Sequence, residues 1–83
     1  MNLILELMQA DDTRGGWFKR VVASENIQAL EDCAHITPPE GTNSWLLYRS
    51  KGWYCKHAIQ DIMTAIGEPF VDLTWKEGAN VQP

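Results

Sequence analysis

Two Cys-x-His pairs are the residues of this chain best suited to chemistry, and they contain every cysteine and histidine in the sequence. The first pair is Cys33 and His35, and the second pair is Cys55 and His57. Two thiolates and two imidazoles could complete a tetrahedral zinc site. A Cys2His2 zinc-binding module is therefore one interpretation, although this spacing matches no common zinc module.

The backbone conformation at each pair decides whether both side chains can reach one ion. In a strand, residues i and i+2 share a face, whereas in a helix they point about 200° apart. We expect Cys55 and His57 to lie near the start of a helix, because Cys55 continues an apolar stripe with Ile59 and Ile62. The two side chains then point to opposite sides, so the sequence predicts no bound metal and no other cofactor.

A small cysteine-dependent enzyme is the catalytic interpretation of the same residues. Cys55 at a helix N-terminus would have its thiolate stabilised by the helix dipole. His35 would then serve as the base, and Asp32 or Asp61 would orient it. A packed, unreactive thiol explains these residues more simply, and so short a chain has little room for a substrate cleft. The sequence therefore predicts no catalytic residue.

The elements that would position these side chains follow from the spacing of apolar residues. Alternation predicts strands over residues 3–8 and 17–23, joined by a polar loop over 11–16. Ser24 is a good N-cap for a helix, and the adjacent prolines Pro38 and Pro39 must end that helix. These signals predict an N-terminal hairpin followed by a helix.

The second half of the chain predicts a strand, a helix and a last strand. The strand covers residues 45–49, and the helix runs over 54–66 with Gly67 as its C-terminal signal. Alternating apolar residues predict the last strand over 70–75. The expected fold is an α+β domain of order ββαβαβ, with a four-stranded, mainly antiparallel sheet and two helices packed on one face.

One domain over residues 1–77 with a flexible tail over 78–83 accounts for the whole chain. A rival assignment pairs residues 46–48 and 53–55 as a hairpin, with a shorter helix from Ala58. In that assignment Cys55 would lie on a strand rather than on a helix.

Residues 45–57 form a basic, aromatic segment that contains no acid, whereas the segments on either side carry an excess of acid. Five residues of this segment are the expected partner surface: Tyr48, Arg49, Lys51, Trp53 and Lys56. Aromatic and basic residues together anchor protein interfaces, and they can also hold the bases and phosphates of a single strand. A packed aromatic core with a solvated basic rim is the more common arrangement of such a segment.

The composition limits the classes of partner. The net charge of −4 argues against affinity of the whole molecule for nucleic acid or for an anionic membrane. We find no signal peptide and no apolar run that could span a membrane, so we expect a cytoplasmic protein.

The predicted function is a small, non-enzymatic protein-interaction module that occludes a surface on a larger protein or nucleoprotein complex. An accessory or inhibitory protein of a phage or another mobile element fits this size and the lack of a catalytic motif. A single-stranded nucleic-acid binder is the alternative, and exposed sheet edges are compatible with a homodimer.

Overall fold

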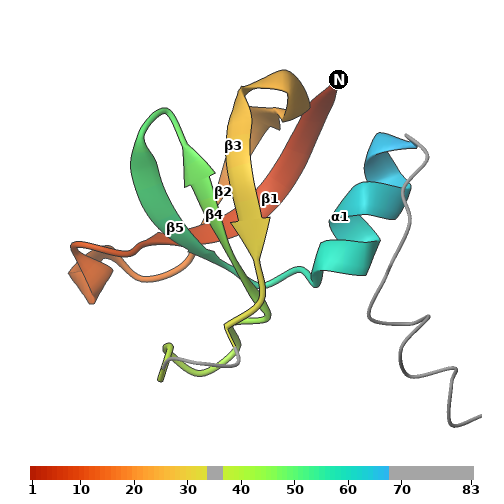
Figure 1. Cartoon of the computed structure of the whole chain (residues 1–83). Coiled ribbons are helices and arrows are strands. Elements are labelled where there is room, and N and C mark those ends of the chain that lie inside the picture. Colours follow the sequence, from red (N-terminus) through yellow and green to blue (C-terminus); the bar gives the residue numbers. More distant parts are fainter. Residues whose placement is uncertain (34–36, 68–83) are drawn as a thin grey trace, which may run out of the picture.

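The computed structural model describes residues 1–33 and 37–67. Within this part of the chain there are five strands, two single 3₁₀ turns and one α-helix (Figure 1). In chain order the elements are β1 (Asn2–Gln9), η1 (Thr13–Gly15), β2 (Phe18–Ala23), η2 (Ser24–Asn26), β3 (Ile27–Glu31), β4 (Ser44–Tyr48), β5 (Lys51–Cys55) and α1 (Ile59–Ile66).

The five strands form one antiparallel sheet in the order β2-β1-β5-β4-β3. Strand β1 pairs with β2 from Asn2 to Leu7 and with β5 from Leu7 to Gln9, so it takes part in two halves of the sheet. One half contains β1 and β2, and the other contains β3, β4 and β5. This order places β2 and β3 at the two edges of the sheet.

The core lies between the two halves, on the inner face of each strand. Leu3, Leu5 and Leu7 alternate with more exposed residues along β1, as expected for a strand with one buried face. The largest cluster of buried residues contains Leu3, Leu5, Leu7, Val22, Leu46, Tyr48, Trp53, Cys55 and Ile62. Ile62 is the contribution of α1, so the helix covers one open side of the sheet.

Helix α1 begins at Ile59 and not at Tyr54, so the helix predicted over residues 54–66 is wrong in its first turn. Its end is as expected, because Gly67 adopts a left-handed conformation and donates its amide to the Met63 carbonyl at 3.1 Å. The residues before α1 form β5, which confirms the rival hairpin. Trp53 and Cys55 are both buried, and that spacing of two is the period of a strand.

The predicted helix after Ser24 is also wrong, because the chain makes one 3₁₀ turn and then enters β3. Ile27 and Leu30 are spaced as on a helix face, and both pack against the core. A β-bulge between Ile27 and Ala29 explains this spacing, since an extra residue resets the alternation of a strand. The helical period in this segment is therefore produced by an irregular strand.

The α+β class and the antiparallel sheet are confirmed, whereas the predicted count and order of elements are not. The described residues contain five strands and one helix in place of four strands and two helices. The predicted strand over 70–75 and the tail over 78–83 lie outside the described residues. Within residues 1–33 and 37–67, no helix has both the length and the apolar content needed to cross a membrane.

Candidate functional site

An arginine-aromatic cluster lies on the side of the sheet where β2 is the edge strand. We call it the arginine flank and define it by five residues: Phe18, Arg20, Tyr48, Arg49 and Trp53. The Arg20 guanidinium carbon lies 5.1 Å from the Trp53 ring centroid and 5.6 Å from that of Tyr48. The guanidinium carbon of Arg49 lies 5.5 Å from the same Tyr48 centroid. One tyrosine ring therefore supports two cations.

Local pairing explains why these side chains meet. Tyr48 and Trp53 project from the inner faces of β4 and β5, and the Trp53 indole N–H donates to the Tyr48 carbonyl at 3.3 Å. Phe18 packs edge-on against Trp53, with centroids 6.0 Å apart and an interplanar angle of 73°. The antiparallel register places Arg20 two residues further along β2, on the same face as Phe18.

The two arginines of the flank have no carboxylate partner among the described residues. The ion pairs of this part of the chain join Arg14 to Asp12, Lys56 to Glu6 and the terminal amine to Glu25. A guanidinium above an aromatic face is stabilised by the ring, while its N–H donors remain directed outward in a fixed fork. The flank therefore presents two oriented cations that no carboxylate from the described part of the chain neutralises.

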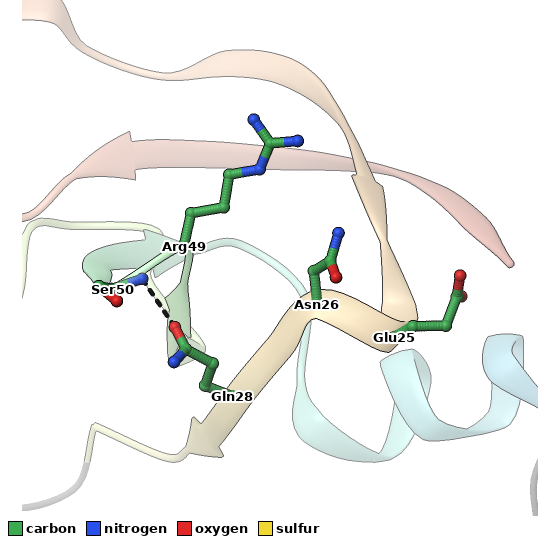
Figure 2. A pocket seen from close by; sticks show the side chains of 5 residues that line it. All are labelled: Glu25, Asn26, Gln28, Arg49 and Ser50. Atoms are coloured by element: carbon green, nitrogen blue, oxygen red, sulfur yellow. Dashed lines mark hydrogen bonds between the residues drawn. The ribbon is translucent and has the colours of Figure 1, made fainter.

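A hollow of about 370 Å³ adjoins the flank between η2 and the β4–β5 turn. Glu25, Asn26, Gln28, Arg49 and Ser50 line it, and Figure 2 shows the Arg49 guanidinium extending away from the turn. The Gln28 side-chain oxygen accepts the Ser50 amide at 2.7 Å, which fixes the turn against β3. The bulged residue of β3 therefore helps to position Arg49.

Glu25 does not neutralise Arg49, although both line the hollow. Its carboxylate accepts from the terminal amine and from the Ser24 hydroxyl, and it points away from Arg49 in Figure 2. The hydrogen bond from the terminal amine, followed by that from Ser24, lowers the pKa of Glu25 to about 2. The carboxylate is thus engaged at the far end of the hollow.

The predicted partner surface is only partly brought together. Tyr48 and Trp53 are 3% and 5% exposed, so their rings support the arginines from below and do not offer a free face. Arg49 and Lys51 are exposed near the β4–β5 turn, as a binding role requires. Lys56 lies elsewhere, because its ammonium sits 5.1 Å from the Trp17 ring centroid and 3.6 Å from the Glu6 carboxylate.

Sequence reasoning missed Phe18 and Arg20, which complete the flank. Their shared face was visible in the alternation of residues 17–23, but nothing local showed that this face meets Tyr48 and Trp53. That contact depends on the sheet order, in which β1 separates β2 from β5. Only the pairing of distant strands could have identified Arg20.

The second Cys-x-His pair serves the fold. Cys55 lies on a strand, so the expected helical arrangement of Cys55 and His57 is wrong. The His57 amide donates to the Cys55 sulfur at 3.5 Å, and the His57 Nε2 atom accepts the Glu6 amide at 3.2 Å. That bond occupies the Nε2 lone pair, which a metal would otherwise use.

The first pair is only partly described, since His35 lies outside the described residues. Within residues 1–33 and 37–67 there is no group of three or more histidine, cysteine or acidic side chains that could hold a metal ion. Burial raises the pKa of the Cys55 thiol, and burial followed by the charge of Asp32 raises that of Cys33. Both shifts reduce the thiolate fraction on which nucleophilic chemistry depends.

No family model, curated protein or solved structure matches this chain. The assignment of a role therefore depends on the physical properties of the flank.

Proposed function

We propose that this chain is a small, non-enzymatic binding module that captures an acidic surface on a larger protein through the arginine flank. The observation that carries the proposal is the pair of guanidinium groups, Arg20 and Arg49, held over one buried ring without a carboxylate partner in residues 1–33 and 37–67. Both guanidinium carbons lie within 5.6 Å of that ring centroid, so neighbouring carboxylates of one partner can reach both.

Arginine side chains that are held in place before a partner arrives make such a surface effective in binding. A free arginine loses rotamer freedom when it binds, whereas these two already rest against aromatic rings. Arginine anchors are frequent among the residues that dominate interface energies, and paired N–H donors match a carboxylate in geometry. Covering a working surface on the partner would make the module an accessory or inhibitory protein, as for a phage or another mobile element.

A charge-matched pair of double variants tests the proposal. Arg20→Gln with Arg49→Gln removes two cations from the flank, whereas Arg14→Gln with Lys56→Gln removes two cations elsewhere. Affinity purification with mass spectrometry should recover the same acidic partner with the wild type and the control pair. We expect the flank variant to bind that partner at least about tenfold more weakly, because truncated charge pairs at interfaces typically cost this much or more.

Folding must be checked alongside capture, and the melting temperature of each variant provides this check. Equal capture by both double variants, with both still folded, would exclude the flank as the binding surface.

Single-stranded nucleic acid is the second candidate, since exposed Arg49 and Lys51 could also hold phosphates. It ranks below an acidic protein because Tyr48 and Trp53 are buried and offer no face on which bases could stack. Fluorescence anisotropy with a labelled oligothymidylate separates the two candidates. Nucleic-acid affinity should fall linearly on a log–log plot against salt concentration as counterions are released.

A further inference from the structure

Strand β2 has one free edge, and the backbone groups on that edge can be identified. The Ser24 amide donates to the Met1 carbonyl at 2.8 Å, and Glu6 directs its own amide and carbonyl away from β2, to His57 and Lys56. Hydrogen-bonded and non-bonded pairs alternate in an antiparallel ladder. The register therefore assigns the bonds toward β1 to Phe18, Arg20 and Val22. Their neighbours Lys19, Val21 and Ala23 direct their N–H and C=O groups to the free edge.

The other edge of the sheet is protected, and this contrast singles out β2. Strand β3 is interrupted by its bulge, and α1 stands beside it, with Met63 and Ile66 lining a shared hollow. Among the described residues no strand pairs with the free edge of β2. Val21 on this edge is 58% exposed, and a strand edge of this kind is a template for pairing with another chain.

The side chains along the edge define the chemistry of an incoming strand. On the inner face, a residue opposite Arg20 would meet the two guanidinium groups of the flank, so a carboxylate is favoured there. On the outer face, a residue opposite Val21 would lie beside Val21, which is 58% exposed and is itself paired with the 69% exposed Ile4 of β1. An apolar side chain is favoured at that position. Alternating acidic and apolar residues would satisfy both faces.

We infer that the acidic partner is recognised as an extended segment that joins the sheet as an antiparallel strand along the free edge of β2. Its acidic residues face Arg20 and Arg49, and its apolar residues extend the apolar outer face that Val21 begins at this edge. The inference rests on the proposed function and specifies its ligand as an alternating acidic-apolar peptide. Main-chain hydrogen bonds to the edge supply affinity, and the alternating side chains supply specificity.

A second copy of this chain is a poorer occupant of the same edge. Antiparallel pairing of β2 with β2 would bring the Arg20 side chains of the two copies onto one face. Like charges across a strand pair are destabilising, and no acid of β2 offsets them, since Phe18–Ala23 contains only basic charges.

N-methylation of a peptide tests strand addition separately from charge recognition. The probe is a labelled seven-residue peptide of alternating glutamate and valine, and a lysine-valine peptide is the control for charge. In antiparallel addition the residues opposite Val21 make the edge hydrogen bonds, so the valine amides of the probe are the ones required. Methylating the valine amides should reduce affinity for the full chain at least about tenfold, while methylating the glutamate amides should leave it nearly unchanged.

Amide hydrogen exchange in the full chain gives a second measurement. Saturating the unmethylated peptide should slow exchange at Val21, while Arg20 and Val22, already bonded to β1, change little. Equal binding of the two methylated peptides, together with unchanged exchange at Val21, would overturn strand addition.

The outcomes also separate this inference from the proposed function. If the peptide binds and the Arg20→Gln with Arg49→Gln variant loses it, but both methylation patterns bind equally, charge recognition stands and strand addition fails. If neither the peptide nor any acidic partner depends on the flank, both fail. Tighter, strongly salt-dependent binding of a fifteen-residue oligothymidylate would identify nucleic acid and would also overturn the inference.

Discussion

The space between the two halves of the sheet has two open sides, and the chain covers them by different means. On the side of β1 that faces away from β2, helix α1 inserts the fully apolar Ile62 between the two halves of the sheet. On the side of β2, the closure is made by Phe18 and Arg20 lying over Trp53 and Tyr48. The first closure removes apolar surface from water, whereas the second leaves charge at the surface. We therefore expect the first side to contribute mainly to stability, and the second is the side that we propose as the binding surface.

The largest effect should come from weakening the helical closure. Ile62→Ala leaves a cavity in the core cluster and should lower the free energy of unfolding by about 2–5 kcal/mol. Urea denaturation monitored by tryptophan fluorescence measures this loss. Ile66→Ala is the matched control, because Ile66 is only partly buried and its truncation should cost less. Equal losses for the two variants would show that Ile62 does not hold the halves together.

At the arginine flank we expect a substitution to change stability little and binding strongly. Arg20→Met keeps an apolar stem over Trp53 and removes the charge, so the free energy of unfolding should change by less than about 1 kcal/mol. Binding of the glutamate-valine peptide should nevertheless fall at least about tenfold. Arg14→Met, at an exposed arginine paired with Asp12, should change neither property. A large loss of stability in Arg20→Met would mean that this side too is closed mainly for stability.

The smallest expected effect on stability concerns the connection between the two halves of the sheet at η2, where Glu25 binds the terminal amine. The pKa of Glu25 is lowered from 4.5 to about 2 in the folded chain, so its carboxylate stabilises the fold above pH 4.5. This contribution is lost as pH falls from 4.5 through about 2. Glu25→Gln should remove it, so the stabilities of the variant and the wild type should converge with acidification. Solvent exposure makes the effect small, and high salt should reduce it further.

The sequence predicted those parts of the fold in which local spacing and tertiary structure agree. Leu3, Leu5 and Leu7 alternate because β1 is regular, and Gly67 ends α1 as a residue tolerant of positive φ should. The helix predicted after Ser24 is wrong because an irregular strand there imitates the helical period, whereas the helix predicted over residues 54–66 is wrong only in its first turn. Ile27 and Leu30 share a face because of a bulge, and no local signal identifies one.

Only the part of the candidate site that is continuous in sequence could be predicted. Arg49 and Lys51 stand out because they interrupt an aromatic segment that lacks acids. Arg20 belongs to the same site through pairing between distant strands, and the spacing of residues along the chain does not indicate which strands pair. The burial of Tyr48 and Trp53 could not be predicted for the same reason, since a basic-aromatic segment has the same sequence pattern whether its rings face solvent or the core.

The tight turn between β4 and β5 has a consequence for the evolution of the molecule. Arg49 and Ser50 both adopt left-handed backbone angles, with φ of 53° and 62°, in a two-residue connection that favours asparagine and glycine. A variant library screened for heat resistance alone should therefore replace this dipeptide early, because a less strained sequence is available. An arginine at a position better suited to asparagine costs stability. Under the proposed function the same residue contacts the partner, so this replacement would raise heat resistance and weaken binding.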